Sequence, residues 1–219
     1  MFEAVIFDWD GTLADTRKAI LVSFHKALSQ AHCDISDEFI ERRIGIGAAE
    51  TFREILRVQN VWFDDVLIRK LVDLKIQAEI DLSDEIKLFP GATELLEILQ
   101  GKVKLGLASM NNRQVIDHLL KTTNTKRFFD VVLTAEEVSK PKPSPEGFLK
   151  CALKLAIKPK NCVVVEDSIF GVEAAKSAEM GCIAVLTGVY SRSEVKKAKP
   201  DVIVDSLKET DSVHKFIFE

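Results

Sequence analysis

Two carboxylates stand one residue apart near the start of the chain, in the segment "VIFDWDGT". Asp8 and Asp10 follow directly after the apolar run 4–7, which is typical of a buried strand. Side chains two positions apart in an extended chain share a face, so both carboxylates can act on one bound group. Gly11 then allows a sharp turn that brings backbone N–H groups toward the same position.

Other polar residues also lie where apolar runs end. Ser109, Glu166 and Asp167 follow such runs directly, and Lys142 lies in the loop after another one. In open parallel sheets, ligands bind in the crevice at the carboxyl ends of the strands. A hydroxyl, an ammonium group and up to four carboxylates are therefore expected to converge on one site.

Such a cluster of carboxylates requires a cation or a proton to be stable. Two carboxylates about 4 Å apart repel each other by roughly 4 kcal/mol at an effective dielectric constant near 20. Ligands that are all oxygen point to a hard divalent ion, and Mg²⁺ usually combines one or two carboxylates with water and phosphate oxygens. Ser109 and Lys142 would bind the other oxygens of an anionic group. A small phosphorylated metabolite, as a phosphate ester, is the best-matched substrate.

The two aspartates can divide the chemistry of phosphate-ester hydrolysis. Asp8 would attack phosphorus, and Asp10 would protonate the leaving oxygen and then deprotonate the water that hydrolyses the aspartyl-phosphate. Trp9 and Met110 are also predicted to contact the substrate. The Trp9 ring should point to the opposite face of the strand, so its backbone N–H is the relevant part.

Strand-like runs alternate with helical patterns along most of the chain. Continuous apolar runs are typical of parallel strands that are buried on both faces. The pattern predicts an α/β fold with a doubly wound, Rossmann-like parallel sheet. The predicted strands are 4–7, 103–108, 131–134, 162–165, 182–186 and 202–204, and the predicted core helices are 92–100, 112–121, 146–156 and 169–179.

The long interval between the first two strands has helical periodicity instead. We expect an inserted α-helical cap domain at residues 15–86, with the catalytic core formed by residues 1–14 and 87–219. Asp15 is expected to hinge or cap the start of the insertion. Trp62 and Phe63 are expected in the core of the cap, where large aromatic side chains gain most from burial.

Composition excludes several classes of protein. The chain has 219 residues, 47% of them hydrophobic, and a net charge of −4, which is unlike a nucleic-acid binder. Its longest apolar runs are far shorter than a membrane span, and no secretory signal is expected. The four cysteines form no CxxC pair. They are expected to be reduced thiols in a cytoplasmic protein, with no obligate protein partner evident.

Four ordered motifs resemble the haloacid dehalogenase-like superfamily of aspartate-nucleophile phosphotransferases. "DWDGTLADT" resembles its first motif, and "LASM" resembles the second, in which an apolar strand ends in Ser or Thr. "KPSPEGF" is similar to the third and "VVVEDSIFGVEAA" to the fourth. The insertion after the first motif resembles the subgroup with a helical cap, which includes phosphoglycolate phosphatases and β-phosphoglucomutases.

This resemblance implies Mg²⁺ as cofactor, Asp8 as nucleophile and Asp10 as acid and base. It implies metal ligation by Asp8, by Asp10 through its backbone carbonyl, and by Asp167, with Glu166 as a further ligand. For the third motif we favour Lys142, because it matches K-P-x-P-E-G-F through to the aromatic residue. Lys140, which also precedes a proline, would then be a solvated loop lysine.

Several alternatives remain open at this stage. A sugar-phosphate mutase of the same superfamily is the main one, although such mutases tend to carry His where this chain has Ile20, S-x-S-K/R-N where it has "SMNNR", and DGV where it has "DGT". A dehalogenase would leave Asp10 and the Glu166–Asp167 pair unexplained. A receiver-like signalling domain would not need Asp10 or the insertion.

Structural interpretations of the same residues also remain open. Ser109 and the acidic pair Glu166–Asp167 could cap the helices that follow them. In the loop "ERRIGIGAAE", Arg42 or Arg43 either contacts an anionic substrate or covers a solvated helix end.

Overall fold

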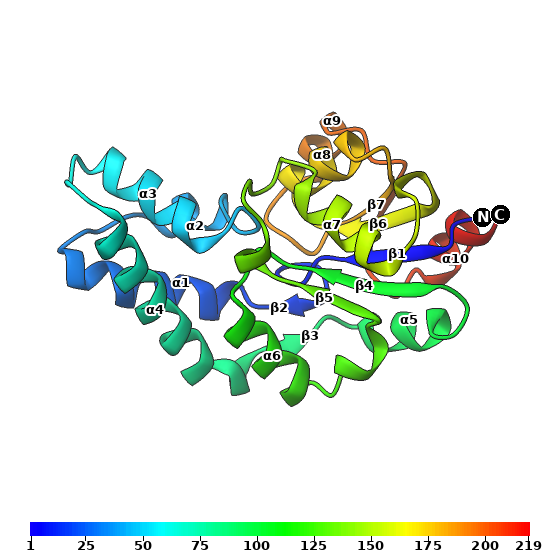
Figure 1. Cartoon of the computed structure of the whole chain (residues 1–219), viewed down its shortest axis with the longest axis horizontal. Helices are drawn as coiled ribbons and strands as arrows, with labels where there is room; N and C mark the ends of the chain where they lie inside the picture. The colour runs from blue at the N-terminus through cyan, green and yellow to red at the C-terminus, as the bar shows by residue number, and fades with distance from the viewer.

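The computed structural model describes all 219 residues, and its centre is a six-stranded parallel sheet (Figure 1). The strand order is β5–β4–β1–β6–β7–β8, so β1 lies between β4 and β6. The architecture confirms the predicted α/β class with a doubly wound sheet. The strands are β1 (Ala4–Phe7), β4 (Lys104–Ala108), β5 (Val131–Leu133), β6 (Cys162–Glu166), β7 (Gly181–Val185) and β8 (Val202–Val204).

Helices cover both faces of the sheet because its central strands are apolar on both sides. In β1, Val5 and Phe7 belong to one hydrophobic cluster, while Ala4 and Ile6 belong to another. The alternation follows from the two-residue period of a strand. The helices are α5 (Ala92–Leu99), α6 (Arg113–Thr122) and α10 (Thr210–Phe218) on the first face, and α7 (Glu146–Leu155), α8 (Ile169–Ser177) and α9 (Arg192–Lys197) on the second.

Four further helices form a group at one end of the molecule, which we name the cap (Figure 1). They have their own hydrophobic cluster, in which the ring centroids of Phe24 and Phe52 lie 4.7 Å apart. The exact division of the chain at residues 15 and 86 stays a prediction. The cap helices are α1 (Arg17–Leu28), α2 (Asp37–Glu41), α3 (Ala48–Val58) and α4 (Asp65–Asp81).

Two very short strands join the cap to the core. β2 (Ala14–Asp15) pairs antiparallel with β3 (Lys87–Leu88), and we name this pair the hinge ribbon. The Phe89 N–H extends it by donating to the Leu13 carbonyl at 2.9 Å. Sequence analysis did not predict these strands, since two residues carry no periodicity.

The predicted core helices match α5–α8 to within two residues at each end, whereas α9 and α10 were not predicted. One prediction in the cap is wrong. Trp62 is not in the cap core, because it lies in the turn between α3 and α4 and is 80% exposed. Phe63 is partly buried against the cap cluster, as expected. None of the helices has both the length and the apolar character that crossing a membrane requires.

Candidate active site

The predicted site residues meet at the carboxyl edge of the sheet, where β1, β4 and β6 end. Sheet pairing continues one residue past two of these strands. The Asp8 N–H donates to the Val165 carbonyl at 3.0 Å, and the Ser109 N–H donates to the Leu133 carbonyl at 3.1 Å. Asp8 and Ser109 are both buried. Their positions are therefore fixed by the sheet rather than by a free loop.

Lys142 reaches the site from the loop between β5 and α7. Its ammonium group donates to Asp8 Oδ1 and to Glu166 Oε1, both at 2.5 Å. All three side chains are almost completely buried. Lys140, the other lysine considered for this motif, is exposed. The structure thus places Lys142 against the predicted nucleophile.

Glu166, the last residue of β6, has both carboxylate oxygens engaged. One accepts from Lys142. The other accepts at 2.9 Å from the N–H groups of Asp167 and Ser168 and from the Ser168 hydroxyl. Glu166 thereby fixes Lys142 and the loop that carries Asp167, and it has less free capacity for a metal ion than Asp167.

Asp167 lies in a space that two glycines leave open. The Thr12 hydroxyl donates to its Oδ1 at 2.8 Å. A Cβ atom at Gly11 would lie 2.3 Å from its Oδ2, and one at Gly188 would lie 2.0 Å from it. Gly11 also has a φ of +85°, which favours glycine. Any side chain at either position would displace this carboxylate.

Asp10 lies on the side of the site that faces the cap. Ser109 Oγ and Asn111 Nδ2 donate weakly to its carboxyl oxygens, both at 3.4 Å. Asn111 also donates to Glu79 Oε1 at 2.8 Å and accepts from Lys75 Nζ at 3.1 Å. Lys75 and Glu79 form a buried ion pair on α4. A buried polar network therefore runs from the cap to the predicted acid and base.

Sequence analysis missed Lys75, Glu79 and Asn111. Lysine and glutamate four positions apart on a helix are typical of an exposed ion pair, so they carried no signal of a site. Asn111 lies just before the predicted helix 112–121 and matches none of the four motifs. Its position two residues after Ser109 was the only available signal.

Trp9 and Met110 differ in their relation to the site. The Trp9 ring is fully buried in the hydrophobic cluster on the first face of the sheet, on the strand face opposite to the aspartates. Only its backbone borders the site. Met110 lies where the core meets the cap, since its Cε would be 3.4 Å from a Cβ at Gly47. It lines a cavity together with Asp10.

Burial shifts the ionisation of three carboxyl groups. It raises the pKa of Asp8 to about 8, although Lys142 lowers it. It raises the pKa of Asp10 to about 6, with a further contribution from the negative charge of Glu79. The pKa of Asp167 is also raised well above its usual value by burial and by neighbouring carboxylates. Burial and the close approach of several carboxylates thus disfavour the ionised form of all three acids.

The residues present fit a magnesium ion. Asp167 Oδ2 lies in the space between the two glycines. The Asp8 carboxylate lies close enough for its negative charge to raise the pKa of Asp167 further. No three His, Cys, Asp or Glu side chains surround a common metal position. Two carboxylates are nonetheless sufficient, because Mg²⁺ typically completes its shell with waters and phosphate oxygens. The donor set is oxygen only, which suits this ion.

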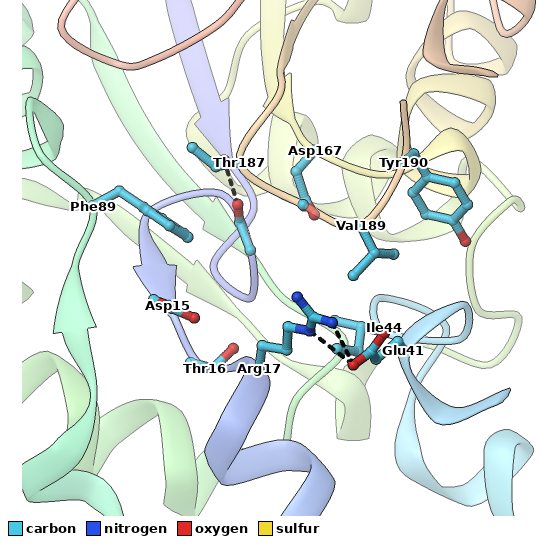
Figure 2. Close-up of a pocket in the computed structure, with 12 residues that line it drawn as sticks. Asp15, Thr16, Arg17, Glu41, Ile44, Phe89, Asp167, Thr187, Val189 and Tyr190 are labelled. Carbon is cyan, nitrogen blue, oxygen red and sulfur yellow. Dashed lines mark hydrogen bonds and ion pairs between the residues drawn. The ribbon is translucent and has the colours of Figure 1, made fainter. Parts of the chain in front are cut away.

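A cavity of about 130 Å³ leads to Asp167 from the boundary between cap and core (Figure 2). Arg17 of α1 and Glu41 of α2 line it from the cap and pair with each other at 2.7 Å. On the core side, the Thr187 hydroxyl donates to the Gly11 carbonyl at 2.5 Å. The cavity gives small molecules access to the Asp167 side of the site.

Comparison with known proteins agrees with this geometry. The family model described as haloacid dehalogenase-like hydrolase matches residues 5–185. A protein of Dickeya dadantii named "Probable phosphatase IndB" is 31% identical, with 94% of this chain and 90% of that protein covered. The phosphorylated carbohydrates phosphatase of Thermotoga maritima is 29% identical, with 94% and 99% covered.

The fold is shared with solved structures over its whole length. A crystal structure of β-phosphoglucomutase from Clostridium difficile superimposes with a TM-score of 0.86 and 28% identity, and each chain is covered completely. The matched family model spans all four motifs that carried the resemblance. The chain therefore belongs to the haloacid dehalogenase-like hydrolase family.

Proposed function

We propose that the protein is a magnesium-dependent phosphatase that hydrolyses a small phosphomonoester through an aspartyl-phosphate on Asp8. The different hydrogen bonding of the two Asp8 carboxylate oxygens is the observation that supports this proposal. Asp8 Oδ1 is held by Lys142, while the buried Asp8 Oδ2 has no hydrogen-bond partner. An oxygen that is fixed in place and makes no hydrogen bond is free to attack once the carboxyl group is ionised.

In the first step, Asp8 Oδ2 attacks phosphorus and the bond from phosphorus to the leaving oxygen breaks. Asp10 gives its proton to that oxygen, so the leaving group departs as a neutral alcohol. A pKa of about 6 lets Asp10 give and take a proton near neutral pH.

In the second step, a water molecule attacks the phosphorus of the aspartyl-phosphate. Asp10, now ionised, takes a proton from that water. The bond between phosphorus and Asp8 Oδ2 breaks, which releases inorganic phosphate and restores both aspartates.

The remaining residues bind the phosphoryl group. Lys142 and Ser109 would interact with its oxygens, since both are buried beside Asp8. Asp8 and Asp167 would hold Mg²⁺, together with the Asp10 backbone carbonyl that the family resemblance implies. When bound, the ion would supply positive charge to the phosphoryl oxygens and allow the carboxylates to ionise.

The names of relatives support phosphate-ester hydrolysis. IndB and the Thermotoga maritima protein are both named as phosphatases, and each is matched over nearly its whole length. Hydrolysis of a phosphate ester is therefore the activity that we propose for this chain.

A sugar-phosphate mutase is a second candidate, favoured by the likeness to β-phosphoglucomutase. We favour hydrolysis because Ile20 stands where such mutases tend to have His. Ile20 is almost completely buried in the cap cluster and lines the cavity beside Asp10. Formation of glucose 6-phosphate from β-glucose 1-phosphate would establish the mutase instead.

A phosphate-release screen over a panel of metabolite monoesters tests the proposal. We expect release with Mg²⁺, none with EDTA, and none from Asp8→Asn, because an amide oxygen is not a nucleophile. Robust release in EDTA, or a near-normal kcat for Asp8→Asn, would show that the proposed chemistry is wrong.

We also propose that the protein acts in the cytoplasm without an obligate protein partner. All four cysteines are free thiols, and three of them are buried, which suits a reducing compartment. Thiol titration of the unfolded protein without reductant should detect four thiols. Detection of two fewer would indicate a disulfide and contradict this proposal.

A further inference from the structure

A cavity between cap and core lies on the leaving-group side of the proposed reaction. Asp10 and Asn111 line it from the core, and Arg43 and Lys75 line it from the cap. Most of its other lining residues are apolar, Phe24 among them. We name it the leaving-group cavity. Because Asp10 is proposed to protonate the leaving oxygen, the rest of the leaving group would extend toward this space, which holds about 30 Å³ in this structure and must widen to admit it.

The charge of Lys75 is already neutralised. Its ammonium group pairs with Glu79 one turn along α4 and donates to Asn111 Oδ1 at 3.1 Å. The side chains of Lys75 and Glu79 are 4% and 0% exposed. A buried pair of this kind is strongly coupled, because separating the partners leaves an uncompensated charge in a low-dielectric site.

The second cation of the leaving-group cavity, Arg43, also has an acidic partner. Arg43 Nε pairs with Glu54, and its Nη1 donates to the Phe39 carbonyl at 3.0 Å. The guanidinium group also stacks over the Phe39 ring, 3.5 Å from its centroid. These contacts fix the charged end of Arg43 within the cap. No cation of the leaving-group cavity is left without an acidic partner.

The same pairing recurs at the two neighbouring cavities. Arg42 pairs with Glu194 of α9 at 2.7 Å, and Arg17 pairs with Glu41 at 2.7 Å. Every cation that the cap contributes to the cavities around the site therefore has its own glutamate. The remaining cation, Lys142, belongs to the core and faces the phosphoryl position.

We infer that the protein selects phosphomonoesters with an uncharged, polar leaving group, such as a polyol or a sugar. Esters whose leaving group carries a carboxylate or a second phosphate would be poor substrates. A second anion would have to displace a glutamate from its cation or remain without a counter-ion in a buried space. The inference rests on the proposed phosphatase activity and adds its substrate class. It also favours the interpretation that Arg42 and Arg43 cover a helix end rather than contact an anionic substrate.

Matched substrate pairs test this inference. Glycerol 3-phosphate and 3-phosphoglycerate differ only in a hydroxymethyl group against a carboxylate, and so do glucitol 6-phosphate and 6-phosphogluconate. We expect kcat/KM to be higher for the neutral member of each pair by about tenfold or more. Equal or better turnover of the carboxylate members would overturn the inference.

Variants that release a cation make the test sharper. Glu79→Gln frees Lys75 and should shift the ratio of kcat/KM toward 3-phosphoglycerate by about tenfold. The ratio is the readout because Glu79 also holds Asn111, so the substitution can change both rates together. Asp81→Asn is the matched control, since it makes the same change on α4 at a side chain that is 52% exposed. It should leave the ratio unchanged.

A second variant covers the case in which Glu79→Gln fails to fold, which thermal unfolding would reveal. Glu54→Gln frees Arg43 at a side chain that is 34% exposed, and it should shift the same ratio in the same direction. If folded Glu79→Gln and Glu54→Gln both keep the wild-type ratio, the inference is wrong while the phosphatase stands. If the wild type hydrolyses no monoester, including p-nitrophenyl phosphate, the proposed function fails and the inference fails with it.

Discussion

Lys142 balances only part of the negative charge in the site. It contacts Asp8 and Glu166, while Asp10 and Asp167 lie nearby without a direct cationic partner. Burial is the main cause of the raised pKa values of Asp8, Asp10 and Asp167, and neighbouring carboxylates raise them further. The partly balanced negative charge is the reason why a divalent cation and an anionic substrate would bind together rather than separately.

The role of Asp10 predicts a dependence on the leaving group. Asp10→Asn should slow phosphorylation of Asp8 by an alkyl phosphate by about 10²–10⁴-fold, because an alkoxide is a poor leaving group without a proton. Phosphorylation by p-nitrophenyl phosphate should be affected far less, since p-nitrophenolate leaves unprotonated. Single-turnover kinetics with both substrates measure this difference. Equal losses for both substrates would argue against proton donation by Asp10.

Asp167 fills the space beside Gly188, so a side chain added at Gly188 should weaken metal binding. In Gly188→Ala, the added Cβ would lie 2.0 Å from Asp167 Oδ2 and must displace it. The Mg²⁺ concentration for half-maximal activity should then rise by about tenfold or more. Gly147→Ala is the matched control, because its Cβ would meet nothing closer than 3.6 Å. An unchanged Mg²⁺ requirement in Gly188→Ala would mean that Asp167 does not hold the metal.

We expect the hinge ribbon to let the cap move relative to the sheet. β2 and β3 are two residues each, and they lie on the two segments that connect cap and core. Across the opposite side of the boundary, the Tyr190 hydroxyl donates to the Arg42 carbonyl at 2.7 Å. We expect the cap to close over the substrate and exclude water by bending at this ribbon.

Loss of the Tyr190 contact should favour the open cap. Tyr190→Phe removes one hydrogen bond to the cap loop, so KM should rise by about three- to tenfold with a smaller change in kcat. Steady-state kinetics measure this split. Ser193→Ala, an exposed change next to the same region, should leave KM unchanged. A fall in kcat with no change in KM would indicate that Tyr190 does not act through cap closure.

The sequence predicted the core elements well, because buried parallel strands leave continuous apolar runs such as "CVVV". It did not predict the hinge ribbon, whose strands are too short for a period. It also missed the buried pair of Lys75 and Glu79, since only tertiary packing distinguishes this pair from a surface ion pair. The residues of the sheet edge were predictable, whereas the cap residues that select the substrate were not.

The molecule consists of a rigid sheet with two hydrophobic clusters and a cap with a third, and the site lies between them. The sheet fixes Asp8 and Ser109, and the cap supplies Lys75 and Glu79. A change in the charges buried at this boundary should therefore affect both the stability and the function of the protein.

Without metal, the stability of the whole protein should depend on pH. The pKa of Asp8 is about 8 in the folded state against 3.8 ordinarily, so the folded state binds more protons between these values. The contribution of Asp8 to the free energy of unfolding is then full below about pH 4 and is lost as the pH rises toward 8. Urea unfolding in EDTA at about pH 6 and about pH 8 should show lower stability at the higher pH.

Mg²⁺ should reduce this loss at about pH 8, because it binds the folded state and favours the ionised carboxylates. Asp8→Asn is the control, since it removes one of the titrating groups and should reduce the pH dependence, to which Asp10 and Asp167 still contribute. A stability in EDTA that increases from pH 6 to pH 8 would contradict the charge imbalance described for the site.

Trapping the covalent intermediate tests whether Asp8 is the nucleophile. In Asp10→Asn, p-nitrophenyl phosphate should still phosphorylate Asp8, but hydrolysis should stall for lack of a base. Acid quenching followed by peptide mass spectrometry should therefore locate a phosphoryl group on Asp8, with none in the Asp8→Asn/Asp10→Asn double variant. A burst of p-nitrophenolate without a phosphoryl group on Asp8, or with the group on another residue, would contradict nucleophilic catalysis by Asp8.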